Sequence, residues 1–153
     1  MRDRARAFLE LNRIALVGVS RDPRDFSRVV LRELLQRGLD PVPVNPTLAE
    51  AEGRRCWARI GEIAPPVKGA LLLTPPAQSA EVVRACLEAG VRELWLHRGA
   101  GAGAATPEAL RVAREAGVEP VTDLCPFMAL EGAGWLHRAH ALFRGAGRMP
   151  GHP

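Results

Sequence analysis

Apolar and polar residues follow one another along this chain in blocks that predict strands and helices in turn. Residues 14–19 form an almost unbroken apolar run of strand length, which is typical of a strand buried on both faces of a parallel sheet. After a short polar loop, apolar residues recur at helical spacing through 26–35, and Gly38 follows as a stop signal. The first unit is therefore predicted to be a strand, a loop and a helix.

The same alternation continues to the end of the chain. Further strands are predicted at 40–44, 68–73, 91–96 and 118–122, and further helices at 3–11, 77–89, 106–116 and 136–143, with a polar loop at 47–55 and one or two helical turns at 57–63. Strands that alternate with helices favour a parallel sheet with right-handed crossovers. We therefore predict an α/β fold: a Rossmann-like, doubly wound, five-stranded parallel sheet in a single three-layer domain over residues 1–145, with 146–153 as a flexible C-terminal tail.

Glycine, proline and small polar residues gather where the predicted strands end. Folds of this kind bind ligands beyond the carboxyl ends of their strands, at the topological switch point. After the first strand, Gly18 lets the backbone approach a ligand closely, and Ser20, Ser27 and Arg28 bring hydroxyls and a guanidinium to the start of a helix. Since a helix N-terminus favours an anion, the first loop is interpreted as a phosphate cradle.

Composition and charge argue against nucleic acid and membranes as binding partners. The formal charge of +4 comes almost wholly from arginine, since Lys68 is the single lysine, and no dense basic run with interleaved aromatic residues indicates nucleic acid binding. No apolar run reaches membrane-spanning length, and the N-terminus lacks a signal-peptide core. We therefore predict a cytoplasmic protein that binds neither nucleic acid nor a membrane. The three cysteines are widely spaced, so a disulfide framework is not expected.

The sequence contains no assignable catalytic set of Ser-His-Asp or Cys-His-Asp type. Cys125 precedes Pro126 at a helix start and is a candidate reactive thiol, although a structural role is the favoured interpretation. His137 and His140 share a helix face and could join Cys125, but a zinc site would need a clearer third and fourth ligand. The prediction is therefore no metal and no catalysis. His97, at the end of a strand, is a candidate ligand contact.

The loops also discriminate between nucleotide classes. A dinucleotide site would show Gly-x-Gly-x-x-Gly after the first strand and an acid near the end of the second. Here the first loop has one glycine and the second strand ends in Asn45-Pro46. Gly99, Gly101 and Asp123 imitate the missing pattern further along, but a small-residue loop followed by a strand-end aspartate is the favoured interpretation. A P-loop motif is absent from the sequence.

Taken together, these motifs resemble the stand-alone CoA-binding domain proteins, which are similar to the N-terminal domain of the succinyl-CoA synthetase alpha subunit. The motifs are Val17-Gly18-Val19-Ser20, Ser27-Arg28-Val29, Pro43-Val44-Asn45-Pro46, Thr74-Pro75-Pro76, Trp95-Leu96-His97-Arg98-Gly99 and Cys125-Pro126. The resemblance covers residues 3–143. It implies that Gly18, Val19 and Ser20 meet the CoA diphosphate, with Ser27 and Arg28 near the phosphates. It also implies that Asn45 and Pro46 border the nucleotide and that Thr74, Pro75 and Pro76 face the pantetheine.

The resemblance implies binding and not chemistry, because the phosphorylated histidine of the synthetase lies in a second domain that this sequence lacks. The prediction is non-catalytic binding of CoA or an acyl-CoA at the strand ends. The predicted cofactor-binding residues are Gly18, Val19, Ser20, Ser27, Arg28, Asn45, Pro46, Thr74, Pro75, Pro76, His97 and Gly99. The alternatives are an NAD(P)-binding oxidoreductase-like domain and an interaction module without a ligand. Whether the protein forms a homodimer stays open.

Overall fold

The computed structural model describes residues 1–98, 101 and 103–131, and in these residues helices and strands alternate as the sequence predicts. The elements are α1 (Arg2–Glu10), β1 (Arg13–Val17), α2 (Phe26–Gln36), β2 (Asp40–Val44), β3 (Glu50–Ala51), β4 (Arg54–Arg55), the 3-10 helix η1 (Ile60–Glu62), β5 (Gly69–Leu72), α3 (Pro76–Glu88), β6 (Glu93–Leu96), α4 (Pro107–Glu115) and α5 (Pro126–Glu131). The predicted helix at 136–143 and tail at 146–153 lie outside the described residues.

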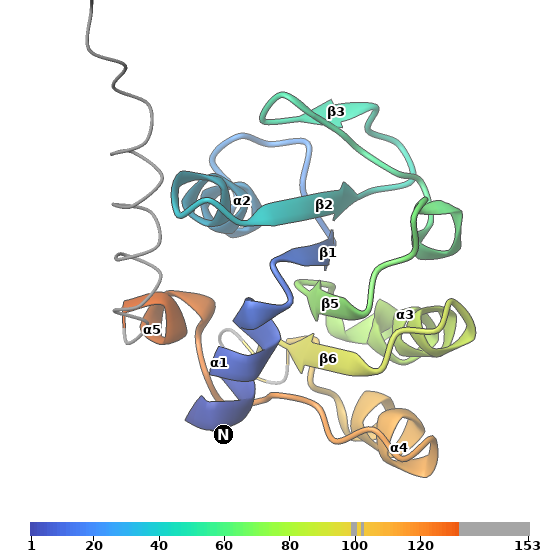
Figure 1. Ribbon diagram of the computed structural model, residues 1–153. Coiled ribbons are helices and arrows are strands. Elements are labelled where there is room, and N and C mark those ends of the chain that lie inside the picture. The colour runs from blue at the N-terminus through green and yellow to red at the C-terminus, as the bar shows by residue number, and fades with distance from the viewer. Residues whose placement is uncertain (99–100, 102, 132–153) are drawn as a thin grey trace, which may run out of the picture.

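A parallel sheet in the order β2-β1-β5-β6 forms the centre of the fold. Helices cover both of its faces, with α1, α2 and α5 on one side and α3 and α4 on the other (Figure 1). The two faces have separate apolar cores: Leu31 and Trp95 belong to the first, and Val83 and Leu94 to the second. The predicted Rossmann-like α/β architecture in a single small domain is therefore confirmed.

The predicted fifth strand is reduced to a single parallel bridge, in which Val121 pairs with Trp95. Val121 donates its backbone N–H to the Leu94 carbonyl at 2.8 Å and accepts from the Leu96 N–H at 2.9 Å. The start of the predicted strand is held by helix α4 instead, because Val118 donates its backbone N–H to the Ala113 carbonyl at 2.9 Å. The described sheet therefore has four strands and not five.

A small hairpin occupies the segment that the sequence analysis assigned to a polar loop. Strands β3 and β4 pair antiparallel around Glu52 and Gly53, whose φ angles are 49° and 75°. Two successive left-handed residues form the type I′ turn that suits a two-residue hairpin. The hairpin was missed because each strand has only two residues. Helix α5 begins at Pro126, the helix start that the sequence analysis noted, although no helix over 126–131 was predicted.

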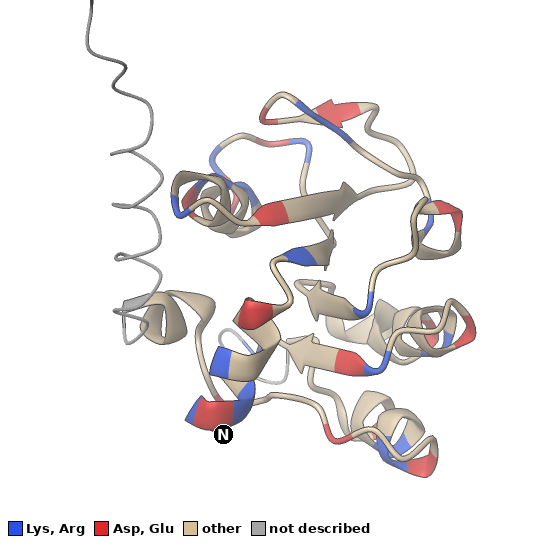
Figure 2. Cartoon of the chain, viewed as in Figure 1, with Lys and Arg blue, Asp and Glu red and all other residues tan. Residues whose placement is uncertain are grey.

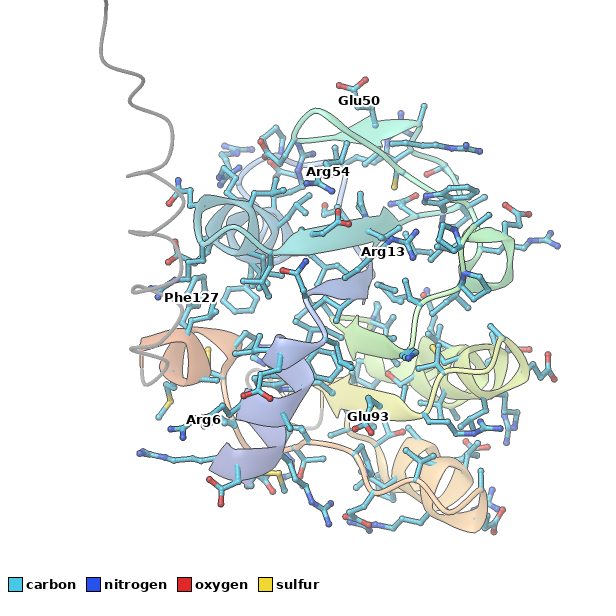
Figure 3. The ribbon with its side chains drawn as sticks, in the orientation of Figure 1. Arg6, Arg13, Glu50, Arg54, Glu93 and Phe127 are labelled. Carbon is cyan, nitrogen blue, oxygen red and sulfur yellow. The ribbon has the colours of Figure 1, made fainter. Side chains whose placement is uncertain are left out.

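Charged residues lie at the amino ends of the central strands and leave the carboxyl ends free of charge (Figure 2). Arg13 starts β1, Asp40 starts β2 and Glu93 starts β6. Asp40 pairs with Arg13 and also with Arg54 of the hairpin, which ties β4 to β2 at this edge (Figure 3). At the carboxyl ends of the strands, the polar and charged groups therefore come only from the loops that follow.

None of the helices within the described residues combines the length and the apolar character that a membrane span requires.

Candidate functional site

Four loops meet at one edge of the sheet because the strands end in register. Val17, the last residue of β1, pairs with Val44 of β2 and with Leu72 of β5, and Leu72 pairs in turn with Leu96. The residues that follow these positions therefore share one edge; they are Gly18, Asn45, Leu73 and His97. After β1 and β5 the chain crosses to opposite faces, so the carboxyl ends of these two strands form the topological switch point.

A cleft of about 750 Å³ opens at this switch point. Its volume lies within the range of about 300–1,000 Å³ that small-molecule sites occupy. Half of the predicted site residues line it, namely Gly18, Val19, Ser20, Asn45, Pro46 and Thr74. Helix η1 and helix α3 supply the opposite walls, with Ile60 and Val82 among their residues. The structure therefore brings the first, second and third strand-end motifs to one cleft, as the sequence predicts.

Gly18 occupies a position where any side chain would be strained. Its φ of +96° is a conformation that other residues rarely adopt. A Cβ at this position would lie 3.0 Å from the carbonyl carbon and oxygen of Leu73 and 3.1 Å from the backbone nitrogen of Thr74. In the structure the close approach is thus between the first loop and the loop after β5. Contact of Gly18 with a diphosphate stays a prediction.

A carboxylate of the protein, that of Asp25, already occupies the N-terminus of α2. The Asp25 carboxylate accepts the backbone N–H of Ser27 at 2.9 Å and its hydroxyl at 2.6 Å. The Ser27 hydroxyl oxygen in turn accepts the backbone N–H of Ser20 at 2.8 Å. Ser27 therefore shapes the first loop, with its one hydroxyl proton committed to Asp25. The sequence analysis placed a phosphate at this helix start, and contact between Ser27 and a ligand stays a prediction.

Arg28 is nearly buried and does not line the cleft. Its Nη2 lies 3.2 Å from the Glu52 carboxylate of the β3–β4 hairpin, and its Nη1 donates to the Ser20 carbonyl at 3.3 Å. Arg32, one turn further along α2, pairs with the same carboxylate at 2.7 Å and donates to the Pro23 carbonyl at 3.0 Å. In this arrangement the two arginines brace the first loop against the hairpin, and a direct contact of Arg28 with a phosphate stays a prediction.

Asn45 joins the first and second loops. Its side-chain amide donates to the Val19 carbonyl at 2.7 Å, and its side-chain oxygen accepts the Thr47 N–H at 2.7 Å. The backbone N–H of Asn45 also donates to the Trp57 carbonyl at 2.9 Å. This last bond, together with the bridge between Val44 and Trp57, carries the segment after Trp57 to the cleft.

Arg59 is the site residue that the sequence analysis missed. It lies on the cleft wall just before η1, and its guanidinium has no ion pair or hydrogen bond to any described residue. A partly hydrated cation on the wall of a cleft is suited to bind phosphate oxygens. Its position depends on the pairing of Trp57 with β2, which no local sequence signal indicates. Three other polar residues of the wall were also not predicted: Glu62, Gln78 and Glu88.

Four of the remaining predicted residues line a second cavity of about 550 Å³, whereas Arg28 lines neither hollow. The second cavity contains Ser27, Pro75, Pro76 and His97 from the predicted set, and Thr74 lines both this cavity and the cleft. The predicted single site is thus divided into two neighbouring hollows. Gly99, the last predicted residue, lies outside the described residues.

His97 lies against the start of α2. Its ring stacks on Phe26 with centroids 5.0 Å apart. Phe127 of α5, which is labelled in Figure 3, contacts the same phenyl ring edge-on. Nδ1 of His97 is buried and has no hydrogen-bond partner among the described residues. Burial lowers the pKa of this imidazole below its ordinary value, so the ring is neutral at pH 7.

Metal ligands do not cluster in the part of the chain that the structure describes, where no group of three His, Cys, Asp or Glu residues could hold an ion. His137 and His140, which the sequence analysis considered with Cys125, lie outside that part.

The cysteines differ in accessibility, which leads to a labelling prediction. Burial raises the pKa of the Cys86 thiol to about 12 and also raises the pKa of Cys56. Cys125 is half-buried and lines the second cavity. Because the thiolate is the nucleophile, N-ethylmaleimide at pH 7.5 is expected to label Cys125 well before the other two. Peptide mass spectrometry would measure the order, and labelling of Cys56 or Cys86 at the same rate would contradict this picture.

The fold and the site define a Rossmann-like α/β domain with a ligand cleft at its switch point. The family model described as a CoA binding domain matches residues 12–131, so the chain belongs to the CoA binding domain family. This membership confirms the resemblance inferred from the sequence motifs.

Known proteins of similar sequence and fold agree with this assignment. The uncharacterized protein YneT of Bacillus subtilis is 31% identical over 113 residues, which cover 74% of this chain and 81% of YneT. A hypothetical protein from Pyrococcus horikoshii OT3 is 29% identical with a TM-score of 0.76, covering 86% of this chain and 90% of that one. A dinucleotide-forming acetyl-coenzyme A synthetase of Ca. Korarchaeum cryptofilum, in complex with phosphate and ADP, is 28% identical with a TM-score of 0.64, covering 78% of this chain and 27% of the synthetase.

Proposed function

We propose that this protein binds CoA, or a thioester of CoA, in the cleft at the switch point, and that it does so without catalysing a reaction. The observation that carries the proposal is the cleft itself, whose rim consists of the strand-end motifs that resemble the CoA-binding proteins. Membership of the CoA binding domain family supports the same ligand.

The polar groups of the cleft suit the two ends of a CoA nucleotide. The backbone N–H of Val19, which lines the cleft, makes no hydrogen bond within the described residues, and with the guanidinium of Arg59 it is a donor for the diphosphate. Glu62 and Glu88, also on the wall, are acceptors for ribose hydroxyls or the adenine amino group. The apolar side chains of Ile60 and Val82 offer a surface for the adenine ring.

Binding without chemistry is proposed because the described cleft wall offers no nucleophile paired with a base. Its titratable side chains are Arg59, Glu62 and Glu88. The Ser20 hydroxyl accepts the Asp22 N–H at 3.1 Å and has no histidine beside it on that wall. His97 lines the other cavity and has no carboxylate partner among the described residues. A cytoplasmic location stays a prediction.

NAD(P) is the alternative ligand, and the structure gives one reason to disfavour it. The residue that follows β2 is Asn45, whose side chain is committed to Val19 and Thr47, so no acid stands at the end of β2 to hold the ribose hydroxyls of NAD. The third possibility, an interaction module without a ligand, predicts that neither nucleotide binds.

Thermal shift separates these three possibilities. A ligand that binds only the native state at a hundredfold excess over Kd stabilises it by about 2.7 kcal/mol. For a domain of this size CoA should therefore raise Tm by about 5–10 °C. NAD should raise it by much less. A larger shift with NAD would favour the oxidoreductase-like alternative, and no shift with either nucleotide would contradict the proposed function.

A further inference from the structure

The second cavity and the cleft adjoin each other along the loop after β5. Thr74 lines both hollows. Ser20, on the cleft side, donates its backbone N–H to the hydroxyl of Ser27, on the cavity side, at 2.8 Å. The two hollows thus share Thr74 and are linked by this pair of serines. A long ligand bound in the cleft could continue past Thr74 into the cavity.

The hydroxyl groups that line the second cavity are already satisfied by the protein. The Ser27 hydroxyl donates to Asp25 and accepts from Ser20. The Thr74 hydroxyl is paired with the buried Ser79 hydroxyl at 2.9 Å. Pro75 and Pro76 have no backbone N–H to offer. Apart from Nδ1 of His97, which is buried and has no partner among the described residues, the cavity offers these groups no further polar contact, so a ligand group gains mainly from being apolar.

The walls and charges of the cavity also favour an apolar, uncharged ligand group. Phe26, Leu73, Pro75 and Pro76 provide apolar surface, and the neutral ring of His97 stacks on Phe26. The guanidinium of Arg98 is neutralised by Asp123 at 2.7 Å. The Asp25 carboxylate also lies on the wall and opposes a second negative charge. An uncharged group suits this cavity better than a carboxylate does.

We propose that the second cavity receives the acyl group of a CoA thioester, and that this acyl group is apolar and uncharged. The physiological ligand is then an acyl-CoA and not free CoA. This inference rests on the proposed binding of CoA in the cleft.

Calorimetry with CoA, butanoyl-CoA and succinyl-CoA tests the inference. Since each buried methylene contributes several-fold in affinity, butanoyl-CoA should bind about tenfold more tightly than CoA. Succinyl-CoA, of similar length but with a carboxylate, should not show this gain. Cys125→Phe places a ring in the cavity and should remove the preference for butanoyl-CoA, with the affinity for CoA unchanged within about twofold.

The controls separate this inference from the function on which it rests. Met128→Phe adds the same ring at an exposed position of α5 that does not line the cavity, and it should keep the preference. If Cys125→Phe does not fold, alkylation of Cys125 in the folded wild type fills the cavity instead. Equal affinity for CoA and butanoyl-CoA, or a preference that survives filling, would overturn the acyl site and leave CoA binding in place. Failure of all three ligands to bind would overturn the proposed function itself.

Discussion

Replacement of Gly18 by alanine is expected to lower the free energy of unfolding by about 2–4 kcal/mol, because two separate costs add. The first is conformational, since a φ of +96° is strained for any residue with a side chain. The second is steric, since the new methyl group would lie 3.0 Å from the Leu73 backbone, which cannot move without displacing the loop after β5. Thermal unfolding should show a decrease in Tm of about 5–15 °C.

The same substitution should weaken CoA binding about tenfold or more, because it moves apart the two loops that form the mouth of the cleft. Calorimetry at a temperature where the variant is folded would measure this loss.

Gly117→Ala is the matched control: Gly117 has a φ of +77°, a Cβ there would meet nothing within 4 Å, and the position does not line the cleft. It should cost only the conformational part, about 1 kcal/mol, and leave CoA binding unchanged. Equal effects of the two substitutions on stability would show that the contact with Leu73 is unimportant.

Arg28→Ala is expected to destabilise the protein even without a ligand, by about 2–4 kcal/mol. The side chain of Arg28 is 10% exposed and that of its partner Glu52 22%, so the pair is only weakly screened by water. The substitution also leaves the Ser20 carbonyl without the donor that now fixes it. Because Ser20 lines the cleft, CoA should bind about tenfold more weakly to the loosened loop.

Arg54→Ala is the matched control for Arg28→Ala. Arg54 lies in the β3–β4 hairpin that also carries Glu52, the partner of Arg28. It pairs with Asp40, but this pair is more exposed and has no contact with the first loop. An exposed ion pair contributes about 0–1 kcal/mol, so Arg54→Ala should change stability little and CoA affinity not at all. Thermal unfolding and calorimetry on both variants would decide the role of Arg28. If Arg28→Ala weakened CoA binding with an unchanged Tm, Arg28 would contact a phosphate directly, as the sequence predicts.

The sequence by itself determined the alternation of elements and therefore the fold class. Apolar runs such as that of β1 cannot be exposed to water, and the helices between them repeat their apolar residues with the helical period, so both signals are local and strong. Thr106 and Pro107 are a further local signal for the helix predicted at 106–116, because in the structure the Thr106 side chain caps α4 by accepting the backbone N–H of Ala109. The strand-end motifs also placed Gly18, Asn45 and Thr74 at one edge of the sheet, because parallel strands that end in register must bring their next residues together.

Only the tertiary structure decided what each polar residue of that edge does. Arg28 pairs with Glu52, 24 residues away, and Asp25 occupies the helix start where a phosphate was expected. Arg59 reaches the cleft because Trp57 pairs with the end of β2. A charged or hydroxyl side chain has several partners of similar strength within reach, and no local pattern specifies which one packing brings closest. The apolar periodicity of a segment thus fixes its element, whereas the partner of a polar group is chosen only when distant segments meet.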